Sequence, residues 1–375
     1  MSHASQKRPR KGRGAIGNPS GRFEPLIREA VDDDWGVGRG AGGDGSGDGG
    51  DADVVPPATV VTDEACRTII ARNDSPDVPF DRSINPYRGC EHGCVYCFAR
   101  PTHAYLGLSP GLDFETHLVA KTNAPAVLER QLRAPGYRPQ PITLGANTDP
   151  YQPIERERCI TRGILEVLSD CHHPVAVVTK SRLVTRDVDL LAPMAARRLG
   201  SVAISVTTLD PRLAGRMEPR ASAPRRRLEA IRTLTDAGIR VSVLVAPLIP
   251  FINDHEIEAI LAAAARAGAV SAGAVLLRLP HEVKDLFADW LQAHAPLKAA
   301  RVLARVRECR GGALYDAAYG TRMTGEGAYA ELLQQRLRLA CGRLGLGYGR
   351  AADFDLDTSQ FRRPDNREGS QLSLL

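Results

Sequence analysis

Long apolar runs and aromatic residues are both scarce in this chain of 375 residues. No apolar stretch approaches the roughly 20 residues that a membrane-spanning helix needs. The N-terminus is basic and lacks the apolar core of a secretory signal, so we expect a cytoplasmic protein with no membrane partner. Aromatic residues make up 5% of the chain, and the hydrophobic content of 43% therefore predicts a mainly aliphatic core.

The cysteines do not follow a disulfide pattern. Cys90, Cys94 and Cys97 lie in one glycine-rich stretch with the spacing C-x3-C-x2-C, and no fourth cysteine is near enough to close the set. Thiolates suit iron–sulfur clusters, zinc or copper, but a structural zinc site wants four ligands. The triad therefore predicts a cubane cluster with one iron open to a cofactor or substrate. A zinc site completed by His92 or His103 is the alternative.

Composition divides the chain into five segments. Residues 1–57 hold a basic tail, which either touches phosphates or is solvated, and a Gly/Asp run; we expect disorder there. Residues 58–83 read as an extended lead-in. The remaining segments are a core over 84–290, helices over 291–349 and a flexible tail over 350–375.

Strand and helix patterns alternate in the core. After a first strand that leads into the cysteine stretch, apolar β-branched segments predict strands over 141–146, 174–179, 201–207, 239–246 and 273–279. Helical patterns occupy 124–132, 157–168, 188–198, 225–237 and 255–267. Repeated strand–helix units give a parallel sheet. Six strands favour an α/β fold with an incomplete (β/α)6 parallel barrel and a helical C-terminal portion, and a doubly wound open sheet is the alternative.

Polar side chains follow successive strands of this expected sheet. Asn147 and Thr148 come after the second strand, Lys180 comes after the third, and Ser205 lies near the end of the fourth. The carboxyl ends of parallel strands meet at one edge, so we expect these groups to share a site. A lysine can neutralise a carboxylate, and hydroxyl groups can bond polar atoms of a ligand.

Charged residues after the fourth strand allow two interpretations. Glu218 and Arg220 are candidates for substrate contact, and a salt bridge at a helix entry is the alternative. The run 225–227 consists of three arginines, which either face phosphates or form a solvated helix start.

The stretch 85–97 resembles the cluster motif of radical S-adenosylmethionine (SAM) enzymes, C-x3-C-x-aromatic-C, with Tyr96 as the aromatic residue. The order of motifs over residues 80–290 resembles the spore photoproduct lyase-like branch, often described as DNA repair photolyase-like. The resemblance implies a [4Fe–4S] cluster on Cys90, Cys94 and Cys97, with SAM contacts from Tyr96, Asn147, Thr148, Lys180 and Ser205.

The resemblance also implies a reaction. The reduced cluster cleaves SAM to a 5′-deoxyadenosyl radical, which abstracts hydrogen from a substrate, here expected to be a DNA lesion; a reductant such as flavodoxin or ferredoxin supplies the electron. One position departs from the lyases, because the residues 145–147 hold Gly-Ala-Asn where a lyase cysteine returns hydrogen. The alternatives are a substrate other than nucleic acid and a non-catalytic metal-binding module associated with nucleic acid.

The last five residues form a separate motif. Gln371–Leu375, with the sequence Gln-Leu-Ser-Leu-Leu, resembles the short peptide with which bacterial DNA polymerases and repair proteins bind the sliding clamp. The glutamine offers polar anchoring, and the leucines suit an apolar pocket. A chance apolar terminus is the alternative.

Overall fold

The computed structural model describes residues 9–24, 58–349 and 355–365. Six parallel strands form the centre of its main sheet, in the order β3 (Arg82–Ile84), β6 (Ile142–Leu144), β7 (Val175–Thr179), β8 (Gly200–Ser205), β9 (Arg240–Leu248) and β10 (Ser271–Leu276). Each strand pairs with the next one of this series along the chain. A doubly wound sheet requires a reversal of strand order, which is absent from these six strands.

Two short strands bound this sheet. β2 (Ile70–Arg72) pairs antiparallel with β3, and β11 (Gly347–Tyr348) pairs parallel with β10. The sheet is therefore open between β2 and β11 in the described residues. The expectation of an incomplete parallel barrel is confirmed.

A second, smaller sheet lies beside the first. β1 (Val60–Glu64) pairs parallel with β5 (His117–Lys121), and β4 (Tyr87–Arg88) pairs antiparallel with β5. The short helix α1 (Asp113–Thr116) directly precedes β5. Only a strand near 59–62 was expected in this region, and β4, with two residues, is too short to give a clear pattern.

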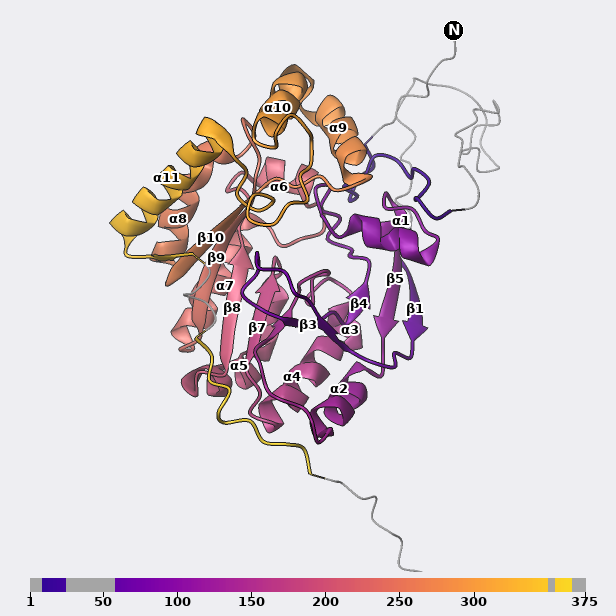
Figure 1. Cartoon of the computed structure of the whole chain (residues 1–375), viewed down its shortest axis with the longest axis vertical. Coiled ribbons are helices and arrows are strands. Elements are labelled where there is room, and N and C mark those ends of the chain that lie inside the picture. Colours follow the sequence, from indigo (N-terminus) through magenta and orange to yellow (C-terminus); the bar gives the residue numbers. More distant parts are fainter. Residues whose placement is uncertain (1–8, 25–57, 350–354, 366–375) are drawn as a thin grey trace, which may run out of the picture.

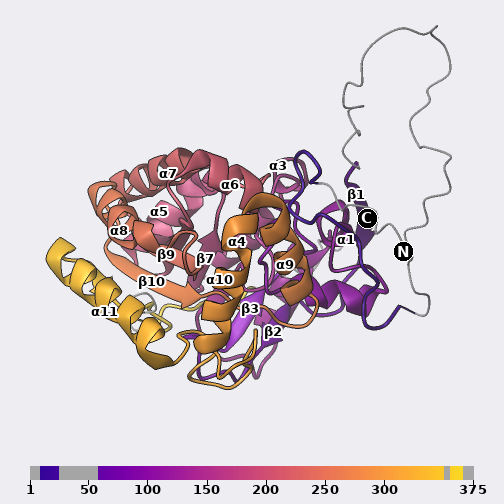
Figure 2. The ribbon, with the colours of Figure 1, turned by 90° about the horizontal axis from the view of Figure 1, so that it is seen from above.

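Helices cover the outer side of the main sheet. The expected helices are α2 (Ala124–Arg133), α3 (Glu155–Arg158), α4 (Ile160–Asp170), α5 (Val188–Ala196), α7 (Pro224–Asp236) and α8 (Ile257–Arg266). One expected helix, 157–168, is divided into α3 and α4 because Cys159 adopts a left-handed conformation with φ 50°. Figure 2, the view from above, shows α7 and α8 along the outside of the strands.

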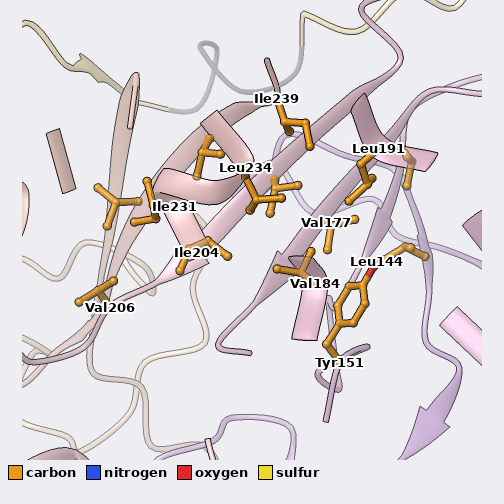
Figure 3. Packing of buried hydrophobic residues seen from close by; sticks show 14 of the residues in the cluster. Leu144, Tyr151, Val177, Val184, Leu191, Ile204, Val206, Ile231, Leu234 and Ile239 are labelled. Carbon is orange, nitrogen blue, oxygen red and sulfur yellow. The ribbon is translucent and has the colours of Figure 1, made fainter. Parts of the chain in front are cut away.

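The core between sheet and helices is aliphatic, as the composition predicts. Ile231 and Leu234 of α7 pack in one buried cluster with Ile204 and Val206 at the end of β8 (Figure 3). Tyr151 is the aromatic residue labelled in that view, and its side chain is fully buried. Burial of apolar surface at roughly 25 cal/mol per Å2 makes this layer the main source of stability.

The C-terminal portion is helical, as expected. Its helices are α9 (Val283–His294), α10 (Pro296–Glu308) and α11 (Gly327–Leu344). α9 and α10 lie beyond the carboxyl ends of the central strands (Figure 1). No helix in the described ranges is both long and apolar enough to cross a bilayer.

Two described segments pack on the core although the sequence suggested unpacked tails. Residues 9–24 include the buried Ala15 and Ile16. In residues 355–365 the Phe361 ring packs against Tyr137 and His173. Composition argued against packing because each segment is short and polar, but a few anchoring contacts with the folded core suffice. The Gly/Asp run and residues 371–375 lie outside the described residues.

Candidate active site

The three cysteines of the triad lie in the loop between β4 and the 3-10 helix η1 (Arg100–Leu106). The Cys90 N–H donates to the carbonyl of Phe114 over 2.9 Å, and the Cys97 N–H donates to that of Cys94 over 3.1 Å. Cys90 and Cys94 are buried and Cys97 is half-buried. We call residues 89–97 the cysteine loop.

Two glycines allow this loop to turn. Gly89 and Gly93 have φ values of 75° and 66°, a region that side chains disfavour. A Cβ atom on Gly89 would lie 2.8 Å from Leu118 Cδ2, and one on Gly93 would lie 2.8 Å from Glu115 Oε2. Both the backbone conformation and the available space therefore require glycine at these positions.

The chemistry of the three thiols fits an iron–sulfur cluster. Burial raises the pKa of Cys90, Cys94 and Cys97, and the charge of Asp149 further raises that of Cys90, with smaller effects from Cys94 and Cys97. Bound iron would supply the positive charge that holds all three as thiolates. A bound cluster would therefore offset the burial that raises these pKa values.

The zinc alternative receives no support from the geometry. His92 Nδ1 lies 3.2 Å from Asp149 Oδ2, and His103 Nε2 donates to the carbonyl of His117 over 2.9 Å. Within the part of the chain that the structure describes, no three His, Cys, Asp or Glu side chains converge as ligands of a single ion do. A cubane cluster does not require such convergence, because each cysteine binds a different iron.

Lys180 and Ser205 meet at the carboxyl edge of the sheet, as the strand pattern predicts. Lys180 follows β7, and its Nζ donates to Ser205 Oγ over 2.7 Å and to the Ala246 carbonyl over 3.3 Å. The Lys180 Nζ also lies 5.7 Å from the centroid of the Tyr96 ring, within range of a cation–π contact. Three of the expected SAM contacts therefore come together beside the cysteine loop.

Glu218 lies at the centre of this group. It follows helix α6 (Pro211–Met217), which starts at a cap formed by Asp210 and was not expected from the sequence. The Tyr96 hydroxyl donates to the Glu218 carboxylate, which also accepts from Thr207 Oγ1 over 2.7 Å. The Glu218 Oε1 is 3.5 Å from Lys180 Nζ. We call Tyr96, Lys180, Ser205, Thr207 and Glu218 the edge cluster.

Arg227 neutralises Glu218 from the other side. Its guanidinium pairs with the Glu218 carboxylate and donates to the Ser205 carbonyl over 3.0 Å. Both side chains of this ion pair are almost fully buried. Neither interpretation of the arginine run holds for Arg227, because it faces the core; Arg225 and Arg226 are exposed and pair with Glu229.

Burial lowers the pKa of Lys180 to about 8, while the charge of Cys94 opposes this change. An ammonium group in this position is costly to desolvate, and a ligand carboxylate would offset that cost. The site therefore favours an anionic group beside Lys180.

The hydrogen bonds of Asn147 and Thr148 are to Asn85 and Tyr87, which do not belong to the edge cluster. The N–H groups of both residues donate to Asn85 Oδ1, over 2.9 Å and 3.2 Å, and the Thr148 hydroxyl donates to the Tyr87 carbonyl. The side chain of Asn85 thus fixes the loop after β6. Their contact with SAM stays a prediction.

Asp149 is a site residue that was not among those expected from the sequence. It accepts from Thr179 Oγ1 over 2.6 Å and from the Lys180 N–H over 2.8 Å, and it pairs with His92. Burial acts to raise its pKa, but His92 and these hydrogen bonds leave it below the usual range. Asp149 therefore joins the ends of β6 and β7 to the cysteine loop.

Arg220 lies at the rim of the site. Its guanidinium is 3.0 Å from Glu91 Oε1, and its N–H donates to the His92 carbonyl over 3.3 Å. The Arg220 side chain is 40% exposed, whereas that of Glu91 is buried. This salt bridge connects the residues after α6 to the cysteine loop, rather than lying at a helix entry as the expected alternative did. Substrate contact by Arg220 stays a prediction.

The N-terminal residues 13–16 cover the cysteine loop, which the sequence did not predict. The N–H groups of Gly14 and Ala15 donate to the two oxygens of Glu115 over 2.9 Å and 2.8 Å. Arg100 also pairs with Glu115, and both side chains are fully buried. A Cβ on Gly14 would lie 1.7 Å from the Gly93 carbonyl oxygen. No local sequence pattern predicts these contacts, and Gly14 is the only residue of the segment whose type reflects them.

Comparison with known proteins gives matches to the same region. Residues 84–264 match the radical SAM superfamily. An uncharacterised protein of Mycobacterium tuberculosis is 40% identical over 223 residues, which are 59% of this chain and 66% of the relative. An uncharacterised protein of Methanocaldococcus jannaschii is 28% identical over 173 residues, 46% of this chain and 62% of the relative. The matched residues thus cover less than two thirds of the length of each relative.

Solved structures of spore photoproduct lyase share the fold. One in complex with dinucleoside spore photoproduct aligns with a TM-score of 0.55 and 16% identity, over 77% of this chain and 81% of that chain. A Y98F mutant of the lyase aligns with a TM-score of 0.53 over the same shares. At 16% identity, this similarity shows a shared fold.

Proposed function

Because residues 84–264 form a radical SAM domain, an enzyme domain whose family uses a [4Fe–4S] cluster and SAM, we propose that this chain cleaves SAM reductively to act on a DNA lesion. Cys90, Cys94 and Cys97 would hold the cluster. When bound, the cluster and SAM supply a 5′-deoxyadenosyl radical that abstracts hydrogen from the substrate.

The convergence of Lys180, Ser205 and Tyr96 beside the cysteine loop is the observation that supports SAM binding. A purely structural metal site does not require an ammonium group and an aromatic ring at the adjacent sheet edge. In the proposed complex, Lys180 binds the SAM carboxylate, Ser205 bonds a polar group of SAM, and Tyr96 lies against its adenine. Glu218 and Arg227 hold Tyr96 and Lys180 in place.

The DNA part of the proposal is supported by the order of motifs, which resembles that of the lyases, and by the fold shared with spore photoproduct lyase. Ala146 stands in the segment where the lyases carry their hydrogen-returning cysteine, so the proposal does not include that cysteine route. A reductant of the flavodoxin or ferredoxin class would deliver the electron. A substrate other than nucleic acid is the competing proposal.

Anaerobic reconstitution followed by an assay of 5′-deoxyadenosine from SAM and dithionite tests this function. We expect formation to increase with ultraviolet-damaged DNA and deuterium to be transferred from a labelled lesion. Cys94→Ala should lose both the cluster absorption and the product, whereas Cys159→Ala, at an exposed position outside the cysteine loop, should retain both. If DNA does not change the formation of 5′-deoxyadenosine, the DNA part of the proposal is rejected. If a protein with a fully loaded cluster forms no 5′-deoxyadenosine, the proposed SAM cleavage is rejected.

The sliding-clamp prediction for Gln371–Leu375 concerns residues outside the described part of the chain and stays a proposal. Deletion of these five residues should eliminate clamp pull-down and leave SAM cleavage intact. Replacement of Leu372 and Leu374 by alanine in the full chain should have the same effect. Unchanged pull-down by either variant would reject this partner.

A further inference from the structure

An arginine and an exposed aromatic ring lie together next to the last cysteine. Arg278 follows β10 by two residues, at the carboxyl edge of the sheet, and its guanidinium carbon lies 5.1 Å from the centroid of the Phe98 ring. Phe98 directly follows Cys97 and is 45% exposed. The ring therefore offers a solvent-facing surface beside the cysteine loop, with a cation against it.

Arg278 has no carboxylate partner among the described residues. Its Nη2 has a long contact of 3.5 Å with the Tyr315 hydroxyl, and its Nη1 lies 3.5 Å from Met323 Sδ, a thioether that is a weak acceptor. Its Nε is buried and has no hydrogen-bond partner. By contrast, Arg227 pairs closely with the carboxylate of Glu218. Arg278 thus retains hydrogen-bonding capacity for an anion.

A second arginine strengthens the positive charge at this place. Arg310 is buried, and its Nη2 donates to the Leu277 carbonyl over 2.9 Å while its Nη1 donates to that of Thr321. Burial and the charge of Arg278 lower the pKa of Arg310. The nearby Asp316 accepts bonds from Thr321 and the Ala318 N–H rather than from either guanidinium. Carbonyl groups therefore orient Arg310 without neutralising its charge.

We propose that Arg278 binds a backbone phosphate of a nucleic-acid strand and that Phe98 stacks on a base of that strand. Arginine suits phosphate because its planar fork donates two parallel hydrogen bonds. An exposed aromatic ring next to a cation is the arrangement with which proteins hold single-stranded nucleic acid. This inference rests on the proposed function and specifies how its substrate is held beside the cluster and SAM.

Binding of a fluorescein-labelled oligothymidylate of eight nucleotides to the reconstituted enzyme with SAM tests the inference. Anisotropy is measured at several salt concentrations. Arg278→Ala should weaken binding about tenfold or more and reduce the magnitude of the slope of log K against log salt by about 0.7, because one phosphate contact to a single strand is lost. Phe98→Leu should weaken binding about fivefold or more, since stacking contributes on the order of 1–3 kcal/mol per base, with the slope unchanged.

Matched variants control for unrelated effects. Arg278→Lys should recover part of the affinity and the full salt slope, because it retains the charge but not the planar fork. Arg225→Ala removes an exposed arginine that pairs with Glu229 and should leave binding unchanged. Iron content and the circular dichroism spectrum should match those of the wild type in each variant, which shows that the fold and the cluster are retained. If Arg278→Ala does not fold, the comparison of Arg278→Lys with the wild type carries the test.

Three results would overturn the inference. They are unchanged oligothymidylate binding in Arg278→Ala, absence of binding by the wild type, and preferential wild-type binding of a polyglutamate peptide that Arg278→Ala abolishes. The last result would assign the site to an acidic peptide. The assay requires no turnover, so failure of SAM cleavage would reject the proposed function and leave the binding result independent.

Discussion

The Tyr96 hydroxyl donates a hydrogen bond to the buried carboxylate of Glu218. This contact joins the cysteine loop to the residue that follows α6, 122 positions later in the sequence. Glu218 also bonds Thr207 and pairs with Arg227. A single buried carboxylate therefore fixes the aromatic ring beside the cysteines relative to the carboxyl ends of β7 and β8.

Glu218→Gln should destabilise the fold. The substitution keeps the size of the side chain but leaves the buried Arg227 guanidinium without its counter-charge, so we expect the free energy of unfolding to fall by about 3–5 kcal/mol. Urea unfolding followed by circular dichroism measures this change. Glu229→Gln is the control, because it disrupts an exposed pair with Arg225 and should have little effect. Equal effects of the two variants would contradict the role given to Glu218.

Lys180→Met should reduce SAM affinity by tenfold or more, measured by equilibrium dialysis of the reconstituted protein. It removes the ammonium group proposed to bind the SAM carboxylate. Because burial lowers the pKa of Lys180 to about 8, the wild-type ammonium is lost as the pH rises through that value, and SAM affinity should fall in the same range. Lys284→Met, at an exposed lysine, should retain both the affinity and the pH dependence. A pH dependence that survives in Lys180→Met would reject this assignment.

Gly14→Ala should displace residues 13–16 from the cysteine loop. The new Cβ would lie 1.7 Å from the Gly93 carbonyl oxygen, and overpacking of this kind costs about 1–3 kcal/mol. We expect trypsin to cleave faster after Arg13 and the reconstituted cluster to bleach several-fold faster in air. Gly136→Ala, where a Cβ would meet no atom within 4 Å, is the matched control. Bleaching and cleavage at the wild-type rates would show that the segment does not protect the loop.

Acid should weaken the packing around His173. Burial lowers the pKa of this histidine to about 4, although its hydrogen bond to the Pro174 carbonyl opposes the change. The ring also contacts the Tyr137 hydroxyl over 2.7 Å. The unfolded chain binds a proton near pH 6.5, so the contribution to stability is complete above that pH and is lost as the pH falls toward 4, by up to about 3 kcal/mol.

Unfolding free energies measured between pH 7 and pH 4 check this expectation. His173→Gln should reduce the slope in that range, although not abolish it, since burial also lowers the pKa of His103 to about 4. His255→Gln, at an exposed position, should leave the slope unchanged. An unaltered slope in His173→Gln would contradict the assignment.

Much of the fold follows from local sequence patterns. The apolar segments correspond to β6, β7, β8, β9 and β10, each within two or three residues, because a parallel strand covered on both faces must be nearly continuous in apolar residues. The meeting of Lys180 with Ser205 also follows, since neighbouring parallel strands end at the same edge. α6 was not expected because its seven residues are too few to show a period.

The sequence by itself determined the cysteine loop, the alternation of strands and helices, and the edge at which polar residues collect. Spacing and periodicity encode these features within a few dozen residues. Only the tertiary structure decided that Glu218 binds Tyr96 and Arg227, that residues 13–16 pack on the cysteine loop, and that Arg278 lies against Phe98. The physical reason is that these partners are fixed by burial and charge compensation between distant segments, to which no local pattern refers.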